Sequence, residues 1–199
     1  SAQSLMVVGQ PRCVSSALHR IAALAGELGG GVVRADAATG ASLPALLAPA
    51  LATALQSLKS YEQSRALAEH TERGLVGFTG ALQPKFPDLT RLDGESEPGL
   101  ADNGDLEVDL TALLESAGRA AGTASTVLVL VFDGLHHLDL AQLGALIAGL
   151  HRCGQSALPV LLIGGGEPTL RARAGTAKSY AERSLIFIAC EAAQATPAR

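Results

Sequence analysis

A short segment near the start of the chain has residue types that could bind phosphate. Residues 9–16 read GQPRCVSS and follow an apolar run. Phosphate-binding loops of the pattern G-x-x-x-x-G-K-[ST] need backbone N–H groups turned inward, a lysine for the terminal phosphates and a hydroxyl for Mg²⁺. Gly9 and Ser16 match this pattern, whereas Val14 replaces the second glycine and Ser15 replaces the lysine. The segment therefore predicts, at most, a degenerate phosphate loop.

The cation that this segment does offer is Arg12. No lysine precedes Lys59, so no shift of register supplies the missing ammonium group. A guanidinium on the loop is not equivalent to a lysine at the start of the following helix. Two interpretations of residues 9–16 stay open: a phosphate site that uses Gly9, Arg12, Ser15 and Ser16, and an ordinary connection between a strand and a helix.

A second candidate residue, Asp133, ends the most hydrophobic run of the chain. A carboxylate at the end of a buried strand can hold the hydration shell of Mg²⁺ beside a phosphate loop, with the Ser16 hydroxyl as its partner. Hydrolytic sites of this kind usually carry a glutamate next, to polarise the attacking water. Gly134 occupies that position and cannot act as a base. The alternative for Asp133 is a turn or helix-capping role.

Other polar groups give weaker signals. Gly164–Gly166 allow close backbone approach, and flexibility is the favoured interpretation of this run. His136 and His137 are neighbours that point in different directions, so no metal site is expected from them. Ser15 and Ser16 lack the surroundings of a nucleophilic serine, and catalytic residues stay unassigned. Three arginines could contact phosphate or another subunit, although solvated helix charges are the favoured interpretation: Arg171, Arg173 and Arg183.

The composition of the 199 residues indicates one globular domain. The chain is 48% hydrophobic and 17% charged, which argues against disorder. A net charge of −4 and only three lysines argue against direct nucleic-acid binding. No apolar run is long enough to cross a bilayer, so no membrane contact is expected. Cys13, Cys153 and Cys190 are interpreted as unpaired thiols, which favours a reducing, cytoplasmic location.

The elements that must position these residues alternate along the chain. Apolar, β-branched runs and longer Ala/Leu-rich segments follow one another, as is typical of helices around a parallel sheet. Strands are predicted at Leu5–Val8, Gly31–Arg34, Thr126–Phe132, Leu158–Ile163 and Leu185–Ile188. Helices are predicted at Ser15–Leu28, Ser42–His70 with a kink or break, Leu106–Ala121, Leu140–Cys153 and Pro168–Arg183.

Caps and breakers refine this pattern. Asp105, or Asn103 just before it, is predicted to cap the third helix, and Asp139 the fourth. Residues 73–103 contain many glycines and prolines, so they are predicted to form a loop-rich insertion with at most a short strand at Leu75–Phe78.

The order of these elements and the amino-acid sequences of several segments resemble those of a known family. Residues 97–106 (EPGLADNGDL), the strand that ends at Asp133, residues 158–164 (LPVLLIG) and residues 177–183 (AKSYAER) are similar to bacterial AAA/STAND-type P-loop ATPases and to the ATPase core of archaeal Orc1/Cdc6-like proteins. The resemblance implies a three-layer α/β fold of the P-loop NTPase (ASCE/AAA) kind. It also implies a parallel sheet of strand order 5-1-4-3-2, helices on both faces, and Mg-ATP or Mg-ADP between the first loop and Asp133. A helical lid and a winged-helix region, which such proteins often carry, do not fit within this chain.

The departures from the family pattern change the expected function. Family members that hydrolyse ATP carry a lysine where Ser15 stands and usually a glutamate where Gly134 stands. Loss of both groups removes charge that stabilises the transition state of phosphoryl transfer. We therefore expect a pseudo-ATPase that binds nucleotide weakly or not at all and that serves as a regulatory or interaction module for protein partners or for self-association.

Two alternatives remain. In the first, the domain is a working ATPase or nucleotide switch in which Arg12 replaces the lysine and Ser16 and Asp133 hold Mg²⁺. Asp139 or a partner's side chain then positions the water. In the second, the domain is an accessory part of a DNA-binding regulator whose nucleic-acid contacts lie elsewhere.

Overall fold

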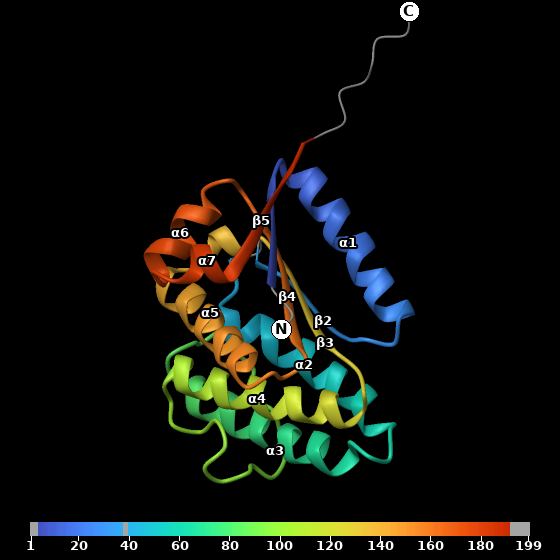
Figure 1. The fold of residues 1–199 in the computed structure, drawn as a ribbon. Coiled ribbons are helices and arrows are strands. Elements are labelled where there is room, and N and C mark those ends of the chain that lie inside the picture. Colours follow the sequence, from blue (N-terminus) through green and yellow to red (C-terminus); the bar gives the residue numbers. More distant parts are fainter. Residues whose placement is uncertain (1–3, 38–39, 192–199) are drawn as a thin grey trace, which may run out of the picture.

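The structure, a computed structural model, describes residues 4–37 and 40–191. Five parallel strands form one sheet in the order β2-β3-β4-β1-β5 (Figure 1). The strands are β1 (Ser4–Gly9), β2 (Gly31–Asp36), β3 (Leu128–Asp133), β4 (Val160–Gly166) and β5 (Leu185–Cys190). The prediction of an α/β fold with a parallel sheet of order 5-1-4-3-2 is confirmed, and each predicted strand overlaps an observed one.

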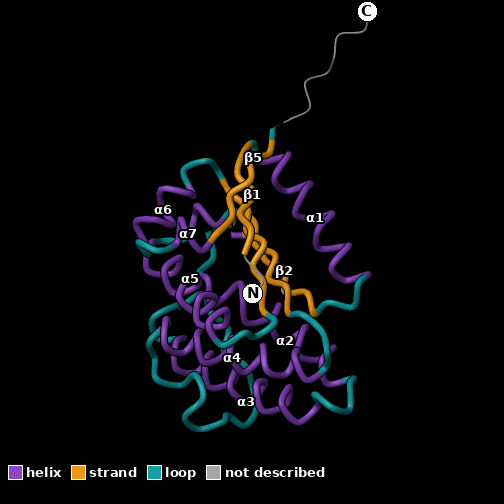
Figure 2. Tube along the Cα trace, in the orientation of Figure 1, coloured by secondary structure: helices purple, strands orange, loops and turns teal. Residues whose placement is uncertain are grey.

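Helices cover the two faces of the sheet unequally. Of the helices that the structure describes, α1 lies on one face of the sheet and the others lie on the opposite face (Figure 2). The helices are α1 (Pro11–Glu27), α2 (Leu43–Lys59), α3 (Arg65–Leu82), α4 (Leu106–Thr123), α5 (Leu140–Gln155), α6 (Leu170–Ala177) and α7 (Ala181–Ser184), with a short 3-10 turn, η2 (Leu135–His137), after β3. The smaller core, beneath α1, contains Val7, Val14, Leu18, Val131 and Ile163.

The alternation of side chains explains why both faces form a core. In β1, Val7 packs beneath α1, whereas Met6 packs into the larger core on the opposite face. Strand β3, which lies between β2 and β4, is apolar at five successive positions, and all five are buried, as expected for a parallel strand covered on both faces. Asp133 follows this run at the carboxyl end of the strand.

The predicted loop over residues 73–103 is wrong in its first part, because residues 73–82 are the end of α3. Gly74, Gly77 and Gly80 recur every three residues and therefore share one face of the helix. The chain that returns after α3 packs on this face, and a side chain at Gly74 would collide with Leu100. These glycines admit a close neighbour and do not break the helix.

Helix ends explain most other boundaries. The predicted Ser42–His70 helix is interrupted at residues 60–64, where the Ser64 hydroxyl donates to the carbonyl of Leu58 at 2.7 Å. The predicted caps are confirmed for Asp105 and Asp139, whose carboxylates accept the N–H groups of Val108 and Gln142. The predicted last helix is divided into α6 and α7. No helix in the part of the chain that is described has the length and apolar character needed to cross a membrane.

Candidate functional site

The candidate site is a small pocket where the carboxyl ends of the strands meet. Its volume is about 150 Å³. Ligands of parallel α/β sheets bind at this edge. The lining residues are Gly9, Pro11, Val14, Ser15, Asp36, Asp133, Gly134, His136, His137, Gly166 and Glu167. Three predicted site residues, Gly9, Ser15 and Asp133, are therefore brought together, while Arg12 and Ser16 are exposed on α1 and do not line this pocket.

The connection between β1 and α1 consists of one residue, Gln10. Strand β1 ends at Gly9, and the helix begins at Pro11. Pro11 has no N–H group, and the N–H group of Val14 already donates to the carbonyl of Gln10 at 3.0 Å. A phosphate loop needs several backbone N–H groups that converge on one oxygen-rich group. Residues 11–16 belong to the helix, so they do not form the loop that such a nest would require.

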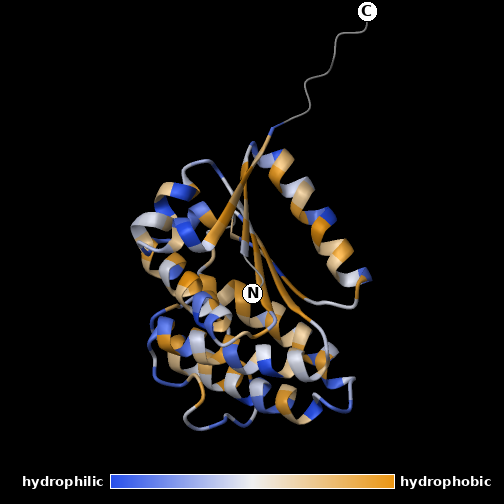
Figure 3. Cartoon of the chain, in the orientation of Figure 1, coloured by the Kyte–Doolittle hydropathy of each residue, from blue (hydrophilic) through white to orange (hydrophobic). Residues whose placement is uncertain are grey.

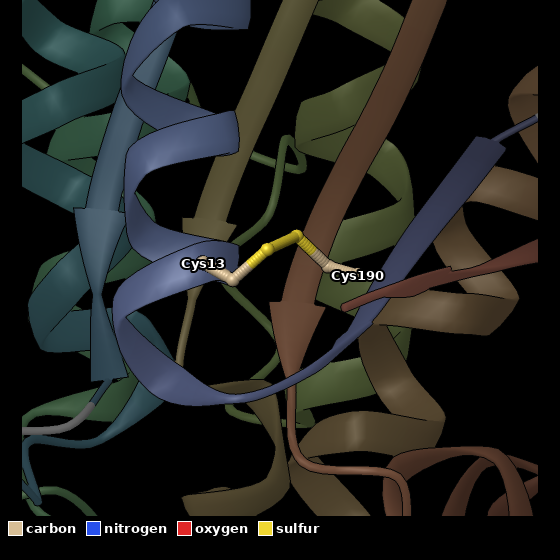
Figure 4. Close-up of a disulfide and its surroundings, with 2 residues drawn as sticks. All are labelled: Cys13 and Cys190. Carbon is tan, nitrogen blue, oxygen red and sulfur yellow. A yellow bond between two sulfur atoms is a disulfide. The ribbon is translucent and has the colours of Figure 1, made fainter. Parts of the chain in front are cut away.

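A disulfide between Cys13 and Cys190 holds this connection against the end of β5 (Figure 4). Cys13 lies in the first turn of α1, and a side chain at Gly9 would collide with the carbonyl of Cys190. The prediction of three unpaired thiols is therefore wrong for two of them, whereas Cys153 is free and buried. The cytoplasmic location inferred from unpaired cysteines loses that support. One-dimensional spacing could not reveal the pair, because 177 positions separate the two cysteines.

Ser15 and Asp133 form the central polar contact of the pocket. The Ser15 hydroxyl donates a hydrogen bond to Oδ2 of Asp133, and the N–H group of Gly134 donates to Oδ1 at 2.7 Å. The serine beside the aspartate is thus Ser15, one position before the Ser16 expected from the phosphate-loop pattern. Gly134 has a φ of +69°, a conformation that disfavours the glutamate of hydrolytic sites.

The glycine run at the end of β4 serves close packing. Gly164–Gly166 belong to the strand, and all three are buried. A side chain at Gly165 would meet Val14 at 2.6 Å and would collide with Leu18, both from α1. A side chain at Gly166 would meet Nδ1 of His136 at 2.9 Å. The favoured interpretation of this run as flexible is replaced by a steric one, since glycine lets α1 and η2 approach the sheet.

The charges of the pocket are mainly acidic. Asp36, Asp133 and Glu167 contribute carboxylates. Burial lowers the pKa of His136, and the neighbouring His137 lowers it further. The N–H group of Glu167 donates to Nδ1 of His136 at 3.2 Å, which also requires the unprotonated ring nitrogen. With His136 neutral, these charges oppose binding of a nucleotide phosphate in the absence of a bound cation.

Other predicted groups lie outside this pocket. Both carboxylate oxygens of Asp139 contact Gln142, at 2.7 and 2.6 Å, in the cap of α5. Arg171 lies over the ring of Phe187, with 5.4 Å between the guanidinium carbon and the ring centroid. Arg173 donates to the carbonyl of Leu138 at 2.5 Å, and Arg183 is exposed.

The sequence patterns do not single out Asp36 or Glu167 as site residues. Asp36 lies directly beside Asp133 in the pairing of β2 with β3, and each ends its strand. A signal is present in the sequence, because Asp36 comes just after the predicted strand Gly31–Arg34, as Asp133 comes just after the predicted strand Thr126–Phe132. Glu167 follows the glycine run of β4 in the same way. Among the described residues, no group of three or more His, Cys, Asp or Glu side chains has the arrangement of a metal site.

Comparison with known proteins identified no counterpart. No protein-family model, no curated sequence and no solved structure matches the chain.

Proposed function

We propose that this domain is a degenerate P-loop-type fold that acts as a regulatory or protein-interaction module and does not turn over nucleotide. The observation that carries the proposal is the single-residue connection between Gly9 and Pro11. It leaves no segment to wrap a phosphate chain, and the Cys13–Cys190 disulfide holds it in place.

The size and charge of the pocket support the same proposal. Pockets that bury drug-sized ligands measure roughly 300–1,000 Å³, whereas this one measures about 150 Å³. Its lining contains three carboxylates and no lysine or arginine. Phosphoryl transfer depends on cations placed around the phosphate oxygens. The chain therefore has the strands and helices of such a fold, but its pocket lacks the cationic side chains that phosphoryl transfer needs.

A nucleotide switch is the second candidate, and one contact favours it. Ser15 and Asp133 are hydrogen-bonded at the pocket. A hydroxyl beside a carboxylate is the pair that holds Mg²⁺ next to a bound nucleotide in P-loop proteins. In this candidate the ligand is Mg-ATP or Mg-ADP, and it enters only if the start of α1 unwinds.

Calorimetric titration separates the two candidates. Mg-ATP and Mg-ADP are titrated into the 199-residue chain, first with the disulfide intact and then after reduction. The interaction module predicts no saturable heat up to a ligand concentration of about 1 mM, the range of a binding free energy near −4 kcal/mol.

Three variants identify the origin of any heat that is observed. Asp133→Ala and Ser15→Ala remove the contact pair, and Ser16→Ala is the matched control at the next position of α1, which does not line the pocket. Saturable heat that disappears in the first two variants and persists in Ser16→Ala establishes the nucleotide switch and rejects the proposal.

A further inference from the structure

Strand β5 is an edge strand with an apolar face that α1 does not cover. It pairs with β1 and with no other strand in the described part of the chain. Ile186 and Ile188 lie beside Leu5 and Val7 of β1, on the face where α1 packs. The two isoleucines are nevertheless 43% and 49% exposed. Helix α1 packs over β1 to β4 and reaches β5 at the disulfide.

The other edge of the sheet shows how an exposed edge is usually protected. Strand β2 contains Arg34 and Asp36, and Arg34 is exposed with its Nη1 2.8 Å from Nδ1 of His19. Charged side chains discourage an edge strand from pairing with another chain. Strand β5 contains no charged residue from Leu185 to Cys190, and Figure 3 shows it in the colours of hydrophobic residues. The two edges of this sheet therefore differ in their readiness to pair.

Charges do occur immediately before and after β5, and they have opposite signs. Arg183 precedes the strand and Glu191 follows it, and both are exposed. The carboxylate of Glu182, the residue before Arg183, lies beside Gly175 of α6. Two antiparallel copies of this strand would place Arg183 of each copy near Glu191 of the other. Two parallel copies would instead place like charges together.

We infer that β5 is a self-association edge, and that two copies of this chain pair antiparallel along it to form one continuous sheet. The inference rests on the proposed function as an interaction module and names its partner. In the register centred on Phe187, Ile186 of each copy lies opposite Ile188 of the other. Cross-strand pairs of β-branched residues and of opposite charges both stabilise such pairing.

The register keeps equivalent faces together. Residues of the same parity oppose each other in it, so the exposed isoleucines of both copies join one apolar surface. Phe187 faces the opposite side of the sheet, where Arg171 of the same copy lies over its ring. The disulfide joins the end of β5, at Cys190, to the first turn of α1.

Charge reversal tests both the edge and its direction. Sedimentation velocity and light scattering of the oxidised chain over a concentration series should show a monomer–dimer equilibrium. Arg183→Glu and Glu191→Arg should each raise the dissociation constant of the dimer about tenfold or more. Each single reversal places two side chains of the same charge opposite each other, and the symmetry of the dimer repeats this pair a second time. The double variant should return the dissociation constant to near that of the wild type.

Matched controls separate this edge from other surfaces. Arg20→Glu reverses an exposed charge on α1 and should leave the dimer unchanged. Ile188→Lys should be folded by circular dichroism and monomeric by sedimentation velocity, whereas Leu28→Lys, at the exposed residue that follows α1, should remain dimeric. Hydrogen exchange should slow at the outer amides of β5 as the concentration rises.

Two results overturn the inference: a chain that stays monomeric at every concentration, and a dimer that none of the β5 variants affects. Failure of the proposed function gives a different result. If the wild-type chain gives a saturable heat of Mg-ATP or Mg-ADP binding and Asp133→Ala does not, the proposal of a non-catalytic module is rejected, whatever the sedimentation experiment shows. The pattern of the charge-reversal variants tests β5 alone.

Discussion

The hydroxyl of Ser15 donates a hydrogen bond to the carboxylate of Asp133, although 118 positions separate the two residues. The contact joins the second turn of α1 to the carboxyl end of β3. It uses one of the two carboxylate oxygens, and the Gly134 N–H group uses the other. In this arrangement the aspartate organises the junction of helix and strand.

Replacement of Ser15 by alanine should therefore destabilise the domain. The expected loss in the free energy of unfolding is about 1 kcal/mol, the net value of one such hydrogen bond. Ser16→Ala is the matched control, because it makes the same change at the next position of α1, which is exposed as Ser15 is but does not line the pocket. Urea unfolding of both variants measures the difference. Equal stability of the two would show that the Ser15–Asp133 contact contributes nothing.

Loss of the disulfide should be the largest single destabilisation. Cross-linking two residues 177 positions apart restricts the unfolded chain strongly. Disulfides over long loops typically contribute about 2–5 kcal/mol. Cys190→Ser, measured by guanidinium unfolding, should lose a stability in this range.

Cys153 provides an internal control for that experiment. Burial raises the pKa of its thiol to about 12, so almost no thiolate is present near neutral pH. After mild reduction of the folded protein, an alkylating reagent should modify Cys13 and Cys190 and spare Cys153. Rapid alkylation of Cys153 under native conditions would contradict the buried environment described above.

Gly165 should not tolerate a side chain. A methyl group there would be forced against Val14 and Leu18 of α1. Gly165→Ala should lower the free energy of unfolding by about 1–3 kcal/mol, as overpacking of a core does. Gly26→Ala is the matched control, since nothing lies within 4 Å of that site and alanine favours the helix interior. The midpoint temperature of thermal unfolding should fall for Gly165→Ala and should stay the same or rise for Gly26→Ala.

His136 should make stability depend on pH in one direction. Burial lowers its pKa in the folded state below the ordinary value of 6.5. The unfolded chain therefore binds the proton more readily, so this contribution to stability is complete above about pH 6.5 and declines as the pH falls through the folded pKa. His136→Gln should lack this decline in urea titrations at a series of pH values. An identical pH dependence in the variant would contradict the assignment to His136.

Local sequence patterns were sufficient to predict most of the sheet. The apolar runs of β1 and β3 identify strands because burial on two faces demands hydrophobic residues at successive positions. Caps were also predictable, because the carboxylates of Asp105 and Asp139 act on N–H groups three positions away. Strand order needed more than local pattern, and the family resemblance supplied it.

The remaining features depend on contacts between distant segments. Gly74 and Gly77 look like helix breakers until the returning chain near Leu100 is placed against them. The sequence predicts that the first helix begins at Ser15, whereas α1 begins at Pro11. Its first turn contains Cys13, which is bonded to the distant Cys190. Asp36 becomes part of the candidate site only when β2 pairs with β3. A linear pattern contains each residue type but not its neighbour in space.

The Cys13–Cys190 disulfide also has a mechanical consequence. It closes a covalent ring over residues 13–190, which contains β2 to β5, α2 to α7 and all but the first two residues of α1. A pulling force applied at the two ends of this chain would pass through the sulfur–sulfur bond and bypass that ring. The oxidised domain should then extend only by its outermost segments in a single-molecule experiment, whereas the reduced domain should unravel along its whole length.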